Sequence, residues 1–342
     1  MRLLRGTRCH HARRIYSPLL PLRRTYAISA APPSQGERFI PLKTTSIQHA
    51  PSEVKTSPTA FLEHVRSPTS GPLLFKGGIG DEGLPRSSEN SRADTLLKAL
   101  RADGDRRVEV EVGRYDRPES GSAGGRFEVP LGVYLDWMTS AAPAEKEQAQ
   151  LYLAQWRACE EVPGLSEMVR RPGVLAALLG QGSVDLYQES FFVGRGATVT
   201  PIHRDPYHNV FSLLASSAPD AHGKHFLIFP PSMNEVLTDA TFSRNTARLD
   251  VVLRRTPGAM DGFDAVLDAN SAPRRVSEAV LDNGGALSCV LREGDTLFIP
   301  RGWWHRVENV EVDGNSGPKA EDHEKRKGWT AGVGWWFLSR SE

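Results

Sequence analysis

The placement of His203, Asp205 and His305 constrains this chain more than any other feature of its sequence. His203 and Asp205 are two positions apart, so in an extended strand both side chains project from the same face. His305, at the end of a distant segment rich in strand-forming residues, is the best third partner. Two imidazoles and one carboxylate form the facial triad that holds non-haem Fe(II) with open coordination positions. The sequence therefore predicts that two distant strands meet at a metal site.

Composition places the chain among ordinary water-soluble globular proteins. Of its 342 residues, 39% are hydrophobic and 24% are charged, and no apolar run has the length of a membrane span. Its three cysteines, Cys9, Cys159 and Cys289, are too few and too scattered for a disulfide framework or a thiolate metal site. We therefore expect a reducing compartment.

The first 26 residues differ sharply in charge from the rest. They contain seven arginines and no acid, and the remaining 35 basic and 41 acidic residues leave the body with a net charge of −6. An Arg-rich, acid-free start is typical of a mitochondrial transit peptide, and Arg24-Thr-Tyr26 resembles a matrix-processing site cut after Tyr26. We expect residues 1–26 to be this presequence and the mature protein to lie in the mitochondrial matrix. The alternative is a basic tail that binds nucleic acid or acidic lipid, with the protein in the cytoplasm or nucleus.

Short strands separated by turns dominate the body, and the predicted helices lie near its front. Helices are expected at residues 59–66 and 93–101, and a strictly alternating strand at Arg107–Val112. This pattern predicts a mainly β fold, a double-stranded β-helix or jelly roll with N-terminal helices packed on the barrel. We expect an extended lead-in at residues 27–57 and one domain at 58–342, with an irregular insertion at about 232–285.

Several segments match a known family in order and spacing. They are Pro72-Leu-Leu-Phe-Lys-Gly77, Leu151-Tyr-Leu-Ala-Gln155, Thr200-Pro-x-His-x-Asp-Pro-x-x-Asn209, Lys224-x-x-x-x-Phe-Pro-Pro231, Gly294-Asp-x-Leu-Phe-Ile-Pro300 with Trp303-Trp-His305, and Trp335-Trp-Phe337. Over residues 58–342 the chain resembles the JmjC or cupin-like family of Fe(II)- and 2-oxoglutarate-dependent oxygenases, especially its small stand-alone hydroxylases.

The resemblance implies a role for each matching residue. His203, Asp205 and His305 match the iron ligands and therefore the catalytic centre. Four further positions match residues that bind the cosubstrate: Lys224, Thr200, Tyr152 and Asn209. Lys224 matches the cation that meets the distal carboxylate of 2-oxoglutarate, because a buried dicarboxylate needs a compensating charge.

Two of the matched positions raise difficulties. Strict alternation puts Thr200 on the strand face opposite His203, although Pro201 offers a place for the strand to bend. Gly334 stands where other family members carry Asn or Ser near the metal, which predicts room for a water. His208, His222 and His225 lie near the motif and are expected at the surface or in loops.

The resemblance implies a dioxygenase that uses Fe(II), 2-oxoglutarate and O₂ and forms succinate and CO₂. We expect the substrate to be a side chain of a protein partner, and the insertion to be the rim that contacts it. The net negative body makes nucleic acid a less favoured partner, although an RNA nucleoside stays open as the substrate. Two other functions stay open, a non-catalytic cupin-like scaffold and a zinc hydrolase with a His₂Asp site. Trp303, Trp304, Trp335 and Trp336 are expected in the core and the cavity wall.

Overall fold

A computed structural model describes most of the chain beyond its N-terminal segment. The described residues are 39–79, 83–84, 90–112, 125–140, 151–196, 198–238, 244–247, 249, 251–256, 262–268, 286–312 and 328–340. The presequence expected at residues 1–26 lies outside them. Pro33–Glu342 forms one compact unit. None of the described helices is long and apolar enough to cross a membrane.

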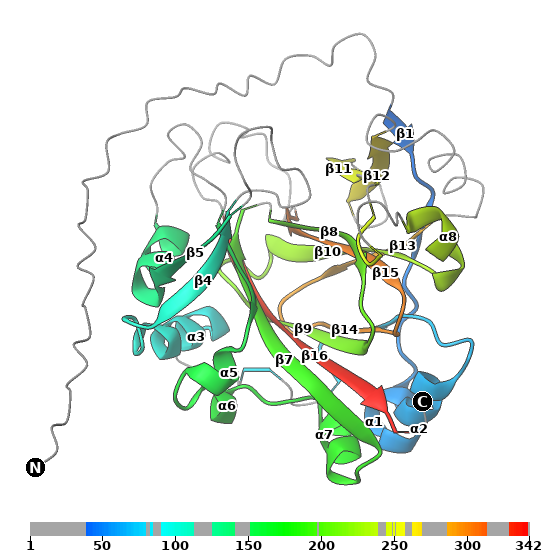
Figure 1. Cartoon of the computed structure of the whole chain (residues 1–342), viewed down its shortest axis with the longest axis horizontal. Helices are drawn as coiled ribbons and strands as arrows, with labels where there is room; N and C mark the ends of the chain where they lie inside the picture. Colours follow the sequence, from blue (N-terminus) through cyan, green and yellow to red (C-terminus); the bar gives the residue numbers. More distant parts are fainter. Residues whose placement is uncertain are drawn as a thin grey trace, which may run out of the picture. The chain divides into compact units, whose positions relative to one another are not determined.

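Two sheets form the barrel, and a small third sheet lies beside them (Figure 1). The larger barrel sheet has the order β3 (Leu73–Phe75), β14 (Thr296–Ile299), β9 (His208–Ser216), β16 (Trp329–Ser339), β7 (Val184–Arg195), β6 (Leu151–Trp156), β4 (Arg107–Val112) and β5 (Arg126–Pro130). The smaller barrel sheet has the order β2 (Thr44–Ser46), β13 (Ala286–Leu291), β10 (His222–Phe229), β15 (Trp304–Glu311) and β8 (Val199–Arg204). The mainly β jelly-roll fold predicted from the sequence is confirmed.

Period-two alternation decides which side chains enter the barrel. On β16, Trp335 and Phe337 pack outward into the largest apolar cluster, whereas Trp336 points inward and lines a pocket. On β10, Leu227 and Phe229 face the opposite side from Phe226, which also lines that pocket. The barrel interior is therefore lined by alternate residues of both sheets.

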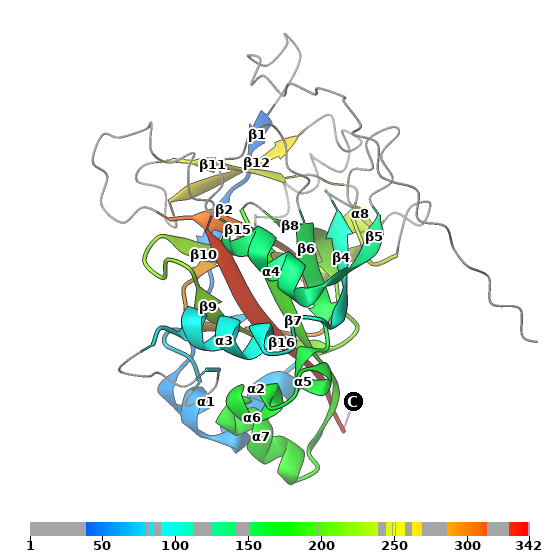
Figure 2. The same cartoon turned by 90° about the vertical axis from the view of Figure 1, so that its left-hand side faces the viewer.

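Helices cover the outer face of the larger sheet, as expected. They are α1 (Ser52–Thr56), α2 (Pro58–Arg66), α3 (Arg92–Arg101), α4 (Leu131–Thr139), α5 (Ala158–Glu161), α6 (Leu165–Met168) and α7 (Gly173–Gly180). Contacts join α2 to β16 and both α5 and α7 to β7, and Figure 2 shows these helices gathered on one side of the two strands. Phe61 of α2 is fully buried, with its ring 5.4 Å from that of Phe298. These contacts stiffen the sheet that carries the pocket wall.

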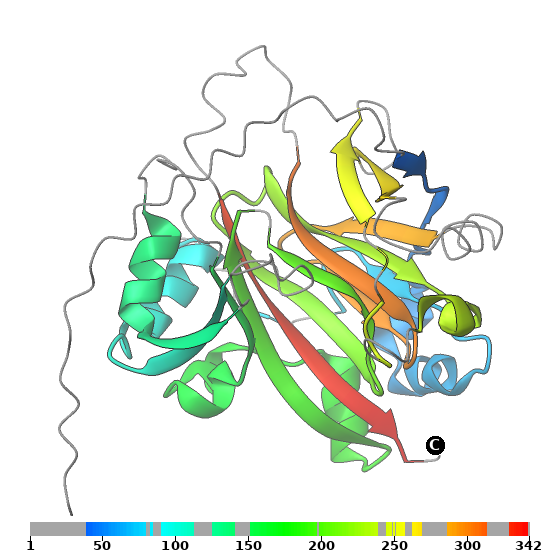
Figure 3. The same ribbon diagram turned by 45° about the horizontal axis from the view of Figure 1, so that its top comes forward.

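Two segments are more regular than the sequence suggests. In the lead-in, β1 (Phe39–Pro41), β2 and α1 form, and β2 pairs in parallel with β13. In the insertion, the 3₁₀ turn η1 (Pro231–Met233), α8 (Asn234–Leu237), β11 (Val251–Arg255) and β12 (Phe263–Asp268) form. β1, β12 and β11 build the third sheet, seen in Figure 3 as the yellow strands beside the dark blue one. The expectation of an irregular insertion is therefore wrong for these residues.

Two of the three neighbouring histidines are buried, so the expectation of surface positions is wrong for them. His208 stacks on Phe298 and Phe337, and its Nδ1 accepts the backbone N–H of Arg301. His225 is buried on the outer face of β10, where its ring meets Phe263 edge-on. Both sit in strands whose outer faces are covered by other elements, which the local sequence does not reveal.

Candidate active site

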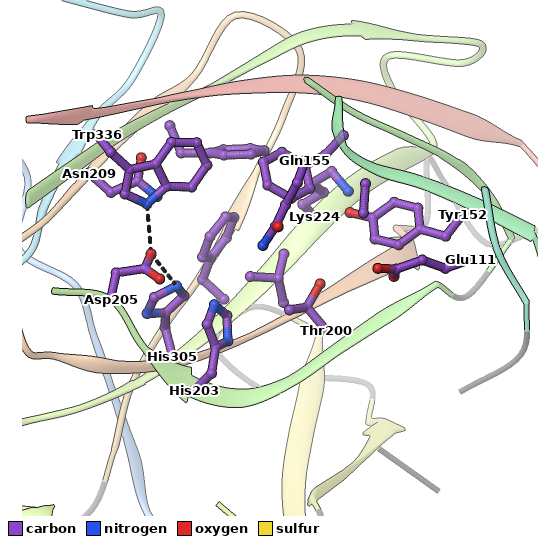
Figure 4. Close-up of a pocket in the computed structure, with 15 residues that line it drawn as sticks. Glu111, Tyr152, Gln155, Thr200, His203, Asp205, Asn209, Lys224, His305 and Trp336 are labelled. Atoms are coloured by element: carbon purple, nitrogen blue, oxygen red, sulfur yellow. Dashed lines mark hydrogen bonds and ion pairs between the residues drawn. The ribbon is translucent and has the colours of Figure 1, made fainter. Parts of the chain in front are cut away.

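His203, Asp205 and His305 meet at the end of the strand pair β8–β15. His203 lies directly opposite His305 in the antiparallel register, and their ring centroids are 4.2 Å apart. Asp205 follows β8 directly, and its Oδ2 lies 3.7 Å from Nε2 of His305. One possible ligand atom from each residue lies within 4.8 Å of the other two (Figure 4). The structure therefore brings together all three residues that the sequence singles out.

Backbone carbonyls fix the orientation of both imidazoles. Nδ1 of His203 lies 2.8 Å from the carbonyl oxygen of Pro201, and Nδ1 of His305 lies 3.2 Å from that of Trp303. A carbonyl oxygen only accepts, so each Nδ1 carries a proton and donates it to the carbonyl, and Nε2 is the ring atom left for a metal. Hydrogen bonds of this kind orient metal-ligating histidines in general.

The charge states of these groups suit a divalent cation. Burial, together with the neighbouring His203, lowers the pKa of His305 to about 4, so this imidazole is neutral near pH 7. Burial opposes ionisation of Asp205, but His305, His203 and a hydrogen bond from Trp336 keep its pKa below the usual value. Two imidazoles and one carboxylate are the donor set of the facial triad, so the residues present fit Fe(II).

Lys224 is fully buried in the same pocket. Its Nζ donates to Oδ1 of Asn309 at 2.6 Å and lies 5.6 Å from the centroid of the Tyr152 ring. Burial lowers the pKa of Lys224 to about 7, and the Asn309 amide to which it donates carries no compensating charge. An anionic ligand in the pocket would compensate this buried cation.

Asn309 and Thr330 form the floor beneath Lys224, and sequence reasoning missed both. Oδ1 of Asn309 accepts from Lys224 and, at 2.9 Å, from the hydroxyl of Thr330. Nδ2 of Asn309 donates to the carbonyl of Gly194 at 3.2 Å. His305, Val307 and Asn309 are alternate residues of one strand, so they share a face. This spacing could have predicted that Asn309 points into the pocket.

A β-bulge resolves the difficulty with Thr200. Between the pairs His305–His203 and Val307–Thr200, β8 has one more residue than β15. The extra residue reverses the alternation, so that Thr200 joins His203 on the inner face and lines the pocket. The bulge lies at Pro201 and Ile202, where the sequence already offered a proline.

Tyr152 and Asn209 also line the pocket, as the resemblance predicts. Oδ1 of Asn209 is buried and has no hydrogen-bond partner among the described residues. Gly334 leaves no room for a water, because the indole of Trp336 fills the space. A methyl group placed on Gly334 would lie 2.8 Å from that ring and 3.1 Å from Oδ1 of Asn209. The expectation of a water-sized space at Gly334 is therefore wrong.

The sequence did not point to Glu111 or to the orientation of Gln155. Glu111 lies opposite Tyr152 in the β4–β6 pair, and Figure 4 shows both carboxylate oxygens turned toward the pocket. Gln155 has a φ of 53°, the only positive value among the described non-glycine residues, where β6 shifts register against β7. Figure 4 shows its amide directed toward the triad.

These residues line one pocket of about 580 Å³, a volume that includes the solvent-filled space at its mouth. Phe192, Phe211, Phe226, Val307 and Trp336 supply apolar walls between the triad and Lys224. The pocket therefore offers a place for a metal ion, a buried cation for an anionic ligand, and an apolar environment that strengthens both interactions.

Comparison with known proteins agrees with this geometry. The family model of the cupin-like domain matches residues 58–342. Similar proteins include the lysine-specific demethylase 8 of Xenopus tropicalis (26% identical, covering 49% of this chain and 32% of the relative). The human bifunctional peptidase and (3S)-lysyl hydroxylase JMJD7 is 28% identical over 36% of this chain and 38% of the relative. The arginine-specific demethylase JMJ22 of Arabidopsis thaliana is 25% identical over 70% of this chain and 40% of the relative.

The chain spans about a third to two fifths of the length of these relatives. Their JmjC type implies Fe(II) and 2-oxoglutarate, which is the pair of groups that the triad and Lys224 would hold. Since the family model covers most of the chain, the protein belongs to the family of the cupin-like domain.

Proposed function

We propose that the protein is an Fe(II)- and 2-oxoglutarate-dependent dioxygenase that hydroxylates a side chain of a protein substrate. The observation that carries this proposal is a His₂Asp cluster and a buried lysine in one apolar pocket. When bound, Fe(II) together with 2-oxoglutarate and O₂ supplies C–H hydroxylation, with release of succinate and CO₂. A scaffold protein or a zinc hydrolase has no use for a buried cation facing such a site.

The residues have separate tasks in this proposal. His203, Asp205 and His305 hold the metal, and Lys224, Thr200 and Tyr152 bind the distal carboxylate of 2-oxoglutarate. Asn209 offers an amide oxygen close to the triad, and this oxygen has no partner within the described part of the chain. The phenylalanine walls keep water away from the reacting centre, which strengthens the charge-assisted bonds to the cosubstrate.

We further propose that the side chain to be oxidised carries a positive charge. Oε1 of Glu111 accepts from Arg126 at 2.8 Å, but its buried Oε2 has no partner among the described residues. Burial raises the pKa of Glu111, although Arg126 opposes the rise. The ionised carboxylate therefore still lacks stabilisation that a second cation could give. A lysine or arginine side chain would supply it. The names of the relatives, which act on lysine or arginine, support the same class.

We favour hydroxylation over demethylation because of features outside the pocket. Both reactions begin with abstraction of hydrogen from carbon, so the triad does not distinguish them. The metal-ligating cluster found among the described residues is the triad itself, and the chain has three cysteines, so no zinc-based histone-reading module is apparent in these parts. The Arg-rich start supports a mitochondrial location, where a non-histone protein is the natural substrate.

The function can be tested with an extract that contains the natural partners. The protein, supplied with Fe(II) and 2-oxoglutarate, is incubated with mitochondrial extract, and the peptides are mapped by mass spectrometry. We expect succinate formation and the gain of one oxygen atom on lysine or arginine residues. Formaldehyde with loss of methyl groups would indicate a demethylase instead. Oxidised RNA nucleosides without any changed peptide would contradict a protein substrate.

Replacing Glu111 with Gln tests the charge of the substrate. We expect KM for a lysine- or arginine-containing substrate peptide to rise about ten- to a hundredfold, because a hydrogen bond between charged groups contributes ~1.5–3 kcal/mol. Turnover of 2-oxoglutarate without peptide should stay unchanged. The matched control is Glu109→Gln, which also removes a carboxylate bonded to Arg126 but one that is largely exposed. Equal effects of the two substitutions would show that Glu111 acts only through Arg126.

A further inference from the structure

The side chain of each candidate ligand is held by one hydrogen bond, and for Asp205 that bond comes from another side chain and not from the backbone. The two histidines are fixed by backbone carbonyls. Asp205 is fixed by Trp336, whose indole Nε1 donates to Oδ2 at 2.8 Å (Figure 4). Oδ2 is also the oxygen that lies 3.7 Å from Nε2 of His305. The indole therefore acts on the oxygen that faces the other ligands.

Asp205 needs this restraint more than the histidines do. It lies just beyond the end of β8, and 23% of its side-chain surface is exposed, against 4% for His305. Apart from His305 and Trp336, the structure describes no side-chain partner of its carboxylate. A carboxylate oxygen has two lone pairs, so one can accept the indole N–H while the other stays free for a metal.

Gly334 makes the position of the indole possible. Gly334 and Trp336 are two residues apart on the inward face of β16, and the indole lies over the glycine. A Cβ atom at residue 334 would lie 2.8 and 3.0 Å from two carbons of the indole ring, which is too close for the ring to stay in place. The observed position of the Trp336 indole therefore depends on a glycine at residue 334.

We propose that Trp336, seated over Gly334, is a positioning residue that orients the carboxylate of Asp205 for metal binding. This inference rests on the proposed function, because it takes the His₂Asp cluster as the metal site. In this role the indole acts through Asp205 and not on the substrate or the cosubstrate. Its effect is to hold one ligand in the geometry that the two histidines already have.

Metal affinity tests the inference without any turnover. Mn(II) serves as the probe, since it takes nitrogen and oxygen ligands and does not oxidise as readily as Fe(II), and the free ion is followed by electron paramagnetic resonance. We expect Trp336→Phe to weaken Mn(II) binding about ten- to a hundredfold, as is usual when a partner of a metal ligand is lost. The phenyl ring keeps the apolar wall, so the thermal unfolding midpoint should change little.

Trp335→Phe is the matched control. The indole of Trp335 also donates to a carboxylate, Oε2 of Glu189 at 2.9 Å, but on the opposite face of the same strand. This variant should bind Mn(II) as tightly as the unchanged protein. If Trp336→Phe and Trp335→Phe bind Mn(II) equally well, the positioning role is wrong. If the unchanged protein binds no Mn(II), the proposed metal site fails together with the inference.

Gly334→Ala provides a second route that keeps the indole N–H. The added methyl group should displace the ring and weaken Mn(II) binding, as Trp336→Phe does. In the double variant Gly334→Ala/Trp336→Phe the two losses should not add, because both act through one hydrogen bond. Additive losses would show that Gly334 acts independently, which would overturn the pairing of the two residues.

Discussion

At the scale of single residues, Lys224 carries the sharpest conflict between stability and function. The fold buries a cation in an apolar pocket, and its pKa falls to about 7 because the charged form loses its hydration. Such a site is costly without its ligand and favourable with it. An anion bound in the pocket would therefore stabilise the charged form of Lys224.

Replacing Lys224 with Met should separate the two effects. We expect KM for 2-oxoglutarate to rise about ten- to a hundredfold, from loss of a charge-assisted bond of ~1.5–3 kcal/mol. Mn(II) affinity should stay the same, and the ligand-free protein should unfold at a higher temperature near pH 7. An unchanged KM would show that another cation meets the cosubstrate.

The pH dependence of this interaction has a defined sign. Below about pH 7 the buried lysine is charged and ready for the dicarboxylate. Above it, binding must take up a proton, so the apparent Kd for 2-oxoglutarate should increase with pH. Because the pKa is lower in the folded state than in the unfolded chain, the stability of the ligand-free protein should rise from pH 7 toward pH 10. Both trends should vanish in Lys224→Met.

The sequence predicted the residues of the candidate site where their positions depended only on spacing along one strand. His203 and Asp205 share a face by simple alternation, and His305 completes the set by residue type. The same rule placed Thr200 on the wrong face of its strand. The bulge that moves it to the inner face is visible only in the pairing register of β8 with β15. Glu111 looked like the solvent side of a half-buried strand, and only its pairing with Tyr152 places it in the pocket.

At the scale of elements, strands with one apolar face were predictable and others were not. β15 went unpredicted because polar and apolar residues mix on both of its faces. His305 and Asn309 point inward with Val307, and Arg306 and Glu308 point outward with Trp304. The outward pair is bonded at 2.6 Å, and the Arg306 side chain is only 3% exposed. Buried polar pairs of this kind give a strand no alternation in hydropathy.

The lead-in is an element of the barrel, and its removal should show this. Leu42 and Ile47 are buried in two different apolar clusters, and the backbone N–H of Ile47 donates to Ser288. Burial of two such side chains contributes about 3–6 kcal/mol, a large part of the stability of a typical domain. We expect a chain that begins at residue 51 to be insoluble or unfolded, and one that begins at residue 39 to fold.

Urea unfolding measures the difference, with Ile47→Ala in the longer chain as the comparison. That variant keeps the β2–β13 pairing and should lose about 2–5 kcal/mol. Equal unfolding midpoints for the chains starting at 39 and at 51 would mean that the lead-in only covers the barrel and does not support it.

At the scale of the whole molecule, charge is divided between a basic start and an acidic body. Arginine supplies all the fixed positive charge of the first 26 positions, whereas the body has a net charge of −6. A negative body gives nucleic acid no general attraction, since non-specific binding to phosphates depends on a cationic surface. The same contrast in charge agrees with the proposal that the basic segment is a presequence, which is removed from the mature protein.

The last prediction concerns this segment, and we propose that it directs the protein to the mitochondrial matrix. Cationic, acid-free segments are drawn inward by the potential across the inner membrane. Residues 1–40 fused to a fluorescent reporter should therefore deliver it to mitochondria, with a new N-terminus at Ala27. The matched control replaces the seven arginines with Gln, which keeps length and polarity and should leave the reporter in the cytosol. A reporter that stays cytosolic with the arginines present would contradict import. One imported equally with and without them would show that the charge is not the signal.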